Sequence, residues 1–131
     1  MCGFVGFTAV DFDRETNKAV VKDMADRIAH RGPDDEGFFV DDDIAMGFRR
    51  LSIIDVGNTG DQPIYNEDRT LVLTFNGEIY NYQDLRKELL EKGHKFYTNT
   101  DSEVLVHGFE EWKEGLLNRL RGMFGFAIWN T

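Results

Sequence analysis

The sequence has only one cysteine, Cys2, and no apolar stretch long enough to cross a membrane. A single cysteine excludes an intrachain disulfide framework and is typical of a protein in a reducing compartment. A membrane-spanning helix needs about 20 consecutive apolar residues, and charged residues begin soon after the start of the chain, at Asp11, Asp13 and Arg14. These absences predict a chain with neither a secretory signal nor a membrane span, and we expect it in the cytoplasm.

Positive charge is also scarce, because 15 Lys and Arg stand against 24 Asp and Glu, which gives a net charge of −9. This balance disfavours binding to nucleic acids and to anionic membranes, whose phosphates attract basic surfaces. Aromatic residues, in contrast, are plentiful, with 11 Phe, 4 Tyr and 2 Trp among 131 residues. So many aromatic side chains indicate a packed core rather than disorder, and the length suits one domain.

Short motifs of metal and nucleotide sites are missing too. None of the three histidines, His30, His94 and His107, has HExxH or cysteine-pair spacing, so the sequence predicts no metal site. The glycine-containing segments GFVGF and RGMFGF lack the GxGxxG spacing of dinucleotide-binding loops, and there is no Walker A loop. We therefore expect no cofactor in this domain.

Hydrophobic periodicity divides the chain into strands and helices. We expect strands at 2–10, 37–43, 44–55, 71–75, 94–99 and 122–130, and helices at 16–29, 81–93, 100–112 and 116–120. Strands joined by both hairpins and helices predict an α+β fold, with helices layered on antiparallel sheet. The last strand, MFGFAIW, carries no charge and has no following segment to cover it. We expect a truncated domain, or one completed by a partner.

Three local patterns define these helices further. Val20, Met24 and Ile28 recur at the spacing of one helical face, which predicts that they form the buried side of the first helix. Asn81 is a favourable N-cap for the second helix. The sequence TDSE at 100–103 has the spacing of a capping box and predicts the start of the third helix.

Cys2 has more than one interpretation. It can be a structural thiol, because a lone cysteine is usually a small buried hydrophobe. It can also be a nucleophile, because removal of Met1 would leave a residue with both a thiol and a free α-amine. A free α-amine has a pKa of about 7.7–8.0 and can accept a thiol's proton at neutral pH. If Met1 is retained, that nitrogen is an amide and we expect Cys2 to be inactive. A redox-sensing thiol is a third interpretation, although no Lys or Arg stands within several residues to activate it.

Other positions also have both a structural and a functional interpretation. Asn76-Gly77 between apolar runs is a strong hairpin signal, but its amide and backbone N–H could instead form an oxyanion hole. Arg50, in an apolar strand, either makes a structural ion pair or binds a carboxylate. Asp101 and Glu78 are either a helix-terminal and a turn carboxylate or acceptors for a substrate ammonium. An arginine with one or two carboxylates would hold both ends of a free α-amino acid.

Seven motifs occur in the order found in class II glutamine amidotransferase domains: MCGFVGF, HRGPDDEG, RRLSIID, DQPIYN, NGEIYNY, TDSEV and GMFGFAIW. Over essentially all of its length the chain resembles the N-terminal glutaminase domain of glutamine-hydrolysing asparagine synthetases. RLSIID and NGEIYN favour that branch over the amidophosphoribosyltransferase and hexosamine-synthesis branches. The resemblance implies the N-terminal-nucleophile hydrolase fold, a four-layer α-β-β-α sandwich with antiparallel sheets.

The resemblance also implies roles for individual residues. Cys2 would attack the side-chain amide of glutamine, with its own amine as the base, and water would cleave the γ-glutamyl thioester to give glutamate. Asn76 and Gly77 would form the oxyanion hole. The residues that would bind the substrate are Arg50, Leu51, Ile53, Glu78 and Asp101.

The sequence departs from the family pattern in three respects. Phe48 stands where the family often has histidine. The family's glutaminase domain continues past GMFGFAIW, and the synthetase domain, which would bind ATP and magnesium, is not in this sequence. We therefore expect residues 1–131 to be an incomplete glutaminase domain that supplies ammonia to a synthetase domain, in cis or in trans, for an acceptor such as aspartate. The alternative is an inactive amino-acid-binding or assembly module that forms a homodimer through its last strand.

Overall fold

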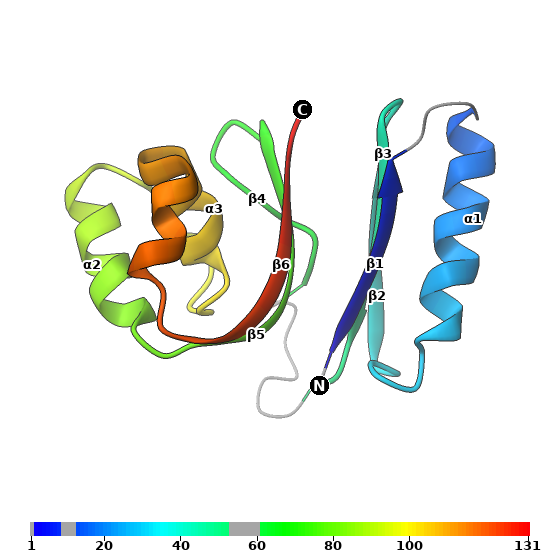
Figure 1. Cartoon of the computed structure of the whole chain (residues 1–131), viewed down its shortest axis with the longest axis horizontal. Helices are drawn as coiled ribbons and strands as arrows, with labels where there is room; N and C mark the ends of the chain where they lie inside the picture. The colour runs from blue at the N-terminus through cyan, green and yellow to red at the C-terminus, as the bar shows by residue number, and fades with distance from the viewer. Residues whose placement is uncertain (1, 9–12, 53–60) are drawn as a thin grey trace. The chain divides into compact units, whose positions relative to one another are not determined.

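The computed structural model describes residues 2–8, 13–52 and 61–131. The chain divides into two compact units, Met1–Pro63 and Ile64–Thr131. Each unit has a three-stranded antiparallel sheet and its own helical segments, which are labelled in Figure 1. Among the described residues, no helix combines the length and the apolar character that a membrane span requires.

The first unit is a sheet with one helix. Its strands are β1 (Gly3–Thr8), β2 (Asp35–Val40) and β3 (Ile44–Arg50), in the order β1-β3-β2, so that β3 is central and antiparallel to both neighbours. The helix α1 (Arg14–Arg27) runs along one face of this sheet (Figure 1). The register pairs Gly3 with Arg49, which brings the start of β1 beside the end of β3.

The predicted first helix is confirmed, but its predicted buried face is wrong by one residue. The side chains of α1 that are buried are Asn17, Val21 and Ala25. Val20, which was expected to be buried, is 42% exposed. A Cβ added to Gly47 of β3 would lie 3.3 Å from Cγ2 of Val21, so the buried face of α1 packs closely against β3 at this glycine.

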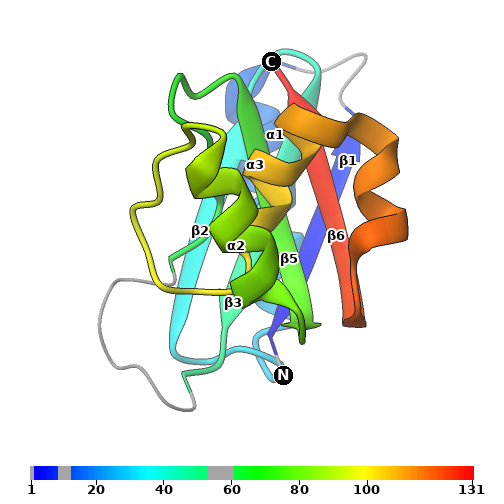
Figure 2. The same cartoon turned by 90° about the vertical axis from the view of Figure 1, so that its left-hand side faces the viewer.

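The second unit places its helices over one face of its sheet. Its strands are β4 (Ile64–Tyr65), β5 (Leu71–Ile79) and β6 (Gly122–Asn130), in the order β4-β5-β6. Figure 2 shows α2 (Tyr82–Glu91) and α3 (Glu103–Trp112) in front of β5, and a 3₁₀ helix η2 (Lys113–Arg119) connects α3 to β6. The core contains side chains from alternate positions of β5 and from both α-helices: Leu71, Leu73, Phe75, Ile79, Leu85, Leu89, Val104 and Leu105.

Two strand predictions in this unit are wrong. The Asn76-Gly77 dipeptide is not a hairpin turn, because β5 continues through it and pairs these residues with Gly125 and Phe124 of β6. Residues 94–99, all of which the structure describes, form a link between α2 and α3 rather than a strand. The predicted last strand is confirmed as β6, which pairs with β5 along its whole length.

Both predicted capping interactions are also absent from their helices. Asn81 occupies the N-cap position of α2, but its side chain binds elsewhere: its NH₂ donates to the Arg119 carbonyl at 2.8 Å and its oxygen accepts the Arg121 N–H at 3.0 Å. At α3 the N-cap residue is Ser102. The Glu103 carboxylate accepts the N–H groups of Tyr97 and Thr98, each at 2.8 Å. Both side chains therefore stabilise tertiary structure instead of a helix end.

Candidate active site

Cys2 lies just before β1, next to the segment that follows β3. Its Sγ accepts the N–H of Leu51 at 3.3 Å, and the same sulfur lies 3.8 Å from the Leu51 carbonyl oxygen. Arg31 Nε donates to the Cys2 carbonyl at 3.3 Å. Cys2 forms no disulfide, and the residue as a whole is partly exposed. The segment that follows β3 therefore holds the sulfur by a backbone contact.

Arg50, the last residue of β3, makes an ion pair in this unit. Its Nη1 lies 3.0 Å from Oδ1 of Asp61, and only 13% of its side chain is exposed. The neighbouring Arg49 pairs with a different carboxylate, Glu36 of β2, at 2.8 Å. The two adjacent arginines thus have separate partners, as expected for side chains on opposite faces of a strand. Of the predicted substrate-binding residues beyond Arg50, Leu51 lies beside Cys2, whereas Ile53 lies outside the described residues.

The turn HRGPDD packs against the backbone of Arg49 and Arg50 and so holds the end of β3 in place. A Cβ on Gly32 would lie 2.4 Å from the Arg49 carbonyl carbon, so only glycine allows the turn to pack this closely. The Asp34 N–H donates to the Arg50 carbonyl at 3.0 Å, and its carboxylate accepts the Ser52 N–H at 2.7 Å. The sequence predicted a turn here but missed this positioning role. The feature of the sequence that pointed to this role was a glycine followed by proline and two aspartates, between a predicted helix and a predicted strand.

Asn76 and Gly77 lie within β5 of the second unit, where glycine is required. Gly77 has φ of 147°, and a Cβ there would lie 2.1 Å from the carbonyl oxygen of Met123 and 2.6 Å from Cα of Phe124. The backbone of β6 therefore occupies the space that any side chain would need. This close approach replaces the hairpin as the structural reason for an Asn-Gly pair.

Asp101 joins this end of β5 through a hydrogen bond. Its Oδ2 accepts the backbone N–H of Ile79 at 2.7 Å. Burial, together with the charge of Glu78, raises the pKa of Asp101 above its ordinary value, against the lowering effect of the hydrogen bond from Ile79. Four of the predicted site residues of this unit, Asn76, Gly77, Glu78 and Asp101, are thus gathered around a single strand end.

The predicted site residues therefore form two sets. Cys2, Arg50 and Leu51 lie together in the first unit, and the other set surrounds the end of β5 in the second. Phe48, the residue that stands in place of the family histidine, is 2% exposed in the middle of β3. A buried imidazole would need hydrogen-bond partners that a phenyl ring does not.

Comparison with known proteins places these residues in a family context. A family model described as "Glutamine amidotransferase domain" matches residues 1–131. The chain is 50% identical over 135 aligned residues to asparagine synthetase [glutamine-hydrolyzing] 1 of Bacillus subtilis (strain 168), covering 99% of this chain and 21% of that protein. It is 40% identical to asparagine synthetase [glutamine-hydrolyzing] 1 of Arabidopsis thaliana, covering 100% of this chain and 22% of the relative. The chain thus spans about a fifth of the length of these curated relatives.

Solved structures give a similar result for the fold. The glutamine phosphoribosylpyrophosphate amidotransferase from B. subtilis, in complex with ADP and GMP, matches with a TM-score of 0.56 and 26% sequence identity. The match covers 70% of this chain and 22% of that one. A structure described as the allosteric regulatory enzyme of purine biosynthesis matches with a TM-score of 0.57, also at 26% identity, over 69% of this chain. These likenesses confirm the predicted α+β fold class.

Proposed function

The chain belongs to the glutamine amidotransferase domain family, with class II enzymes of N-terminal-nucleophile fold as its relatives, and we propose that it hydrolyses glutamine to glutamate and ammonia. The observation that carries the proposal is the state of Cys2. The residue is partly exposed and forms no disulfide, and its sulfur accepts the N–H of Leu51, the residue that follows Arg50. An inert structural cysteine would instead be packed among apolar side chains.

Removal of Met1 precedes the reaction and makes the Cys2 nitrogen a free amine. This amine takes the thiol proton, and the sulfur attacks the δ-carbon of the glutamine amide, forming an S–C bond. The Asn76 side-chain amide and the Gly77 N–H donate to the negatively charged oxygen of the tetrahedral intermediate. The C–N bond then breaks as the amine returns its proton to the departing ammonia. Water hydrolyses the resulting γ-glutamyl thioester, which releases glutamate and regenerates the thiol.

The remaining site residues bind the amino-acid end of the substrate. Arg50 forms hydrogen bonds with the α-carboxylate, for which a planar guanidinium is well suited. Asp101 and Glu78 accept the α-ammonium. Leu51 and Ile53 are the other two residues that we propose for substrate binding.

The chain acts in the cytoplasm as the glutaminase part of an asparagine-synthetase-like amidotransferase. The names of its relatives, asparagine synthetases described as glutamine-hydrolyzing, support the glutaminase part of this proposal. A synthetase domain, in cis or in trans, is its partner and transfers the ammonia to an acceptor such as aspartate. ATP and magnesium belong to that domain, and the glutaminase domain itself needs no cofactor.

The test begins with intact-mass analysis, which shows whether Met1 has been removed. Methionine-free protein is then incubated with glutamine, or with an electrophilic glutamine analogue, and glutamate and covalent adducts are measured. We expect glutamate release and one adduct per chain on Cys2. A Cys2→Ala variant serves as the control and should show neither. Methionine-free wild-type protein that neither releases glutamate nor reacts with the analogue would contradict the proposal.

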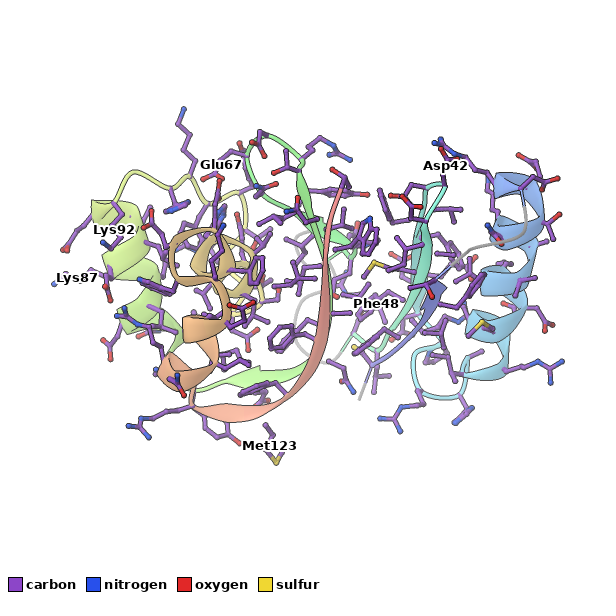
Figure 3. The ribbon with its side chains drawn as sticks, turned by 45° about the horizontal axis from the view of Figure 1, so that its top comes forward. Asp42, Phe48, Glu67, Lys87, Lys92 and Met123 are labelled. Carbon is purple, nitrogen blue, oxygen red and sulfur yellow. The ribbon has the colours of Figure 1, made fainter. Side chains whose placement is uncertain are left out.

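A second candidate function is assembly through β6. Within the described part of the chain β6 has a strand neighbour on one edge only, β5, and two of its large apolar residues, Met123 and Phe124, are 64% and 36% exposed. Figure 3 shows Met123 pointing away from the strand. Pairing of two β6 edges would form a homodimer. Sedimentation measures this directly, and a clean monomer at high concentration would exclude the pairing.

A further inference from the structure

Four potential metal ligands converge in the second unit, apart from every residue assigned a role above. Glu67 lies in the turn between β4 and β5, His94 in the link between α2 and α3, and His107 and Glu110 in α3 itself. One ligand atom of each residue lies within 4.8 Å of the corresponding atoms of the other three. Glu67 lies on the side of the unit where α3 packs (Figure 3).

His107 is buried with one ring nitrogen bound and the other directed at the cluster. Its side chain is 0% exposed, and its Nε2 lies 3.1 Å from a carboxylate oxygen of Glu103, which is itself buried. Because an ionised carboxylate only accepts hydrogen bonds, Nε2 is the nitrogen that donates to Glu103, and in a neutral imidazole Nδ1 is then the nitrogen with a lone pair. Nδ1 makes no hydrogen bond within the described part of the chain and lies 3.3 Å from Oε2 of Glu67.

The carboxylate that orients His107 is itself held by the backbone. Its two oxygens accept the N–H groups of Tyr97 and Thr98, each at 2.8 Å. Glu103 is therefore a fixed acceptor for Nε2, and the imidazole ring cannot readily turn its other nitrogen away from the cluster.

His94 repeats this arrangement. Its Nε2 lies 2.8 Å from Oε1 of Glu111, and its Nδ1 lies 3.3 Å from Oε1 of Glu67 and 3.5 Å from Oε2 of Glu110. Only 9% of the His94 side chain is exposed. The Oε2 atom of Glu110 is buried and, among the described residues, makes no hydrogen bond. Both histidines thus have an outer carboxylate on Nε2 and direct Nδ1 toward Glu67, and Nδ1 of His94 also faces Glu110.

We propose that Glu67, His94, His107 and Glu110 bind a divalent transition-metal ion of the zinc type. Two imidazole nitrogens and two carboxylate oxygens are a donor set that Zn²⁺ accepts in four-coordinate sites. With bonds of about 2.0–2.2 Å, neighbouring ligands of a tetrahedral site lie roughly 3.3–3.6 Å apart. Nδ1 of His94 lies 3.3 Å from Oε1 of Glu67 and 3.5 Å from Oε2 of Glu110, and Nδ1 of His107 lies 3.3 Å from the other Glu67 oxygen, Oε2. One ligand atom from each of the four residues lies within 4.8 Å of the others, so binding of the ion would draw these side chains together. A carboxylate on the outer nitrogen of each ligating histidine is the usual arrangement around such an ion.

The electrostatics of the cluster favour a cation. Glu67 and Glu110 place two carboxylates on the same nitrogen, because Nδ1 of His94 lies 3.3 Å from Glu67 Oε1 and 3.5 Å from Glu110 Oε2. A bound dication would neutralise both carboxylates and coordinate the two atoms that lack hydrogen bonds, Nδ1 of His107 and Oε2 of Glu110. It would also connect three segments that are distant in sequence: the β4–β5 turn, the α2–α3 link and helix α3. The ion would therefore be structural, and its effect would be measured as stability.

The experiment uses the untagged chain after treatment with a chelator and its removal. Zn²⁺ alone is titrated by calorimetry, and X-ray absorption is recorded on the zinc-loaded protein. We expect one Zn²⁺ per chain, a higher melting temperature, and two nitrogen and two oxygen neighbours at about 2.0–2.2 Å. His94→Gln and Glu110→Gln should each weaken binding at least tenfold. His30→Gln, which changes the exposed histidine of the other unit, is the matched control and should bind as the wild type does.

Three results would overturn the proposal. One is substoichiometric binding to wild-type protein. The second is equal loss of binding in His30→Gln, which would indicate adventitious binding to surface histidines. The third is an absorption spectrum with only oxygen neighbours. Circular dichroism without metal verifies that the two site variants are folded, and the absorption result on wild-type protein decides the question even if one variant is not. None of these measurements depends on glutaminase activity.

Discussion

Replacing Asp101 by asparagine should separate substrate binding from folding. The Asp101 carboxylate accepts the Ile79 N–H at 2.7 Å, and an asparagine side chain retains an oxygen that can accept the same bond. The substitution removes the negative charge with almost no change in shape. In the proposed mechanism that charge binds the α-ammonium of glutamine, so the two consequences of the change can be measured independently.

The stability effect follows from the direction of the pKa shift. Burial, and the neighbouring charge of Glu78, raise the folded-state pKa of Asp101 above 3.8, so the folded protein holds this proton more tightly than the unfolded chain. The stability that this group contributes is fully present below the unfolded pKa and is lost as the pH rises through the folded pKa. At pH 7 the ionised Asp101 therefore costs stability. Asp101→Asn should be at least as stable as wild type at pH 7, with the difference vanishing in acid.

The same substitution should weaken glutamine binding, although it does not weaken folding. A hydrogen bond to a charged group contributes about 1.5–3 kcal/mol, and about 1.4 kcal/mol corresponds to a factor of ten. We therefore expect the KM for glutamine to rise roughly ten- to hundredfold at pH 7, with a smaller change in kcat.

Steady-state kinetics and urea unfolding of methionine-free protein together test this reasoning. Asp84→Asn is the matched control, because Asp84 lies exposed in the first turn of α2 and should leave KM unchanged. An unchanged KM in Asp101→Asn would refute the role in ammonium binding. A marked loss of stability at pH 7 would show instead that the charge itself, rather than an acceptor oxygen, holds the end of β5.

Three further substitutions test other parts of the site. Asn76→Ala should lower kcat by about 10²–10³ with little change in KM, because it removes one of the two proposed donors to the oxyanion. A loss of kcat/KM that comes from a raised KM, with kcat unchanged, would contradict this. Gly77→Ala should destabilise the fold by more than about 1–3 kcal/mol in urea unfolding, since its Cβ would lie 2.1 Å from a β6 carbonyl oxygen. Gly32→Ala should raise KM by displacing the backbone of Arg49, 2.4 Å away, whereas Gly115→Ala, with its nearest contact at 3.9 Å, should leave KM unchanged.

Elements whose apolar residues recur over many positions could be predicted from the sequence. The second helix, at 81–93, appears as α2 (Tyr82–Glu91), and the last strand was predicted at 122–130, the bounds of β6. In both, the local pattern and the tertiary environment agree. The face of α1 shows the limit of such reasoning, because successive residues of a helix are only about 100° apart around its axis. Val21, and not the predicted Val20, packs against Gly47 of β3.

The Asn76-Gly77 pair could not be interpreted correctly from its neighbours alone. The dipeptide is a hairpin signal because both of its residues tolerate unusual backbone angles. Here the same tolerance serves a strand, since Gly77 lies where the β6 backbone leaves no room for a Cβ. The partner that imposes this requirement is the last strand of the chain, and no window around the dipeptide contains it.

The metal-type cluster was missed for a related reason. Motif searches assume that ligands lie on one element, as in HExxH, whereas these come from a turn, a link and a helix. The only local signal was His107 and Glu110, three residues apart and so on one face of α3. Glu103 connects the two failures of local reasoning: it does not close the predicted capping box because its carboxylate binds the α2–α3 link and the Nε2 of His107. Both residues depart from a local rule because a contact outside their own strand or helix holds them. At Gly77 that contact is the backbone of β6, and at Glu103 it is the pair of N–H groups of the α2–α3 link.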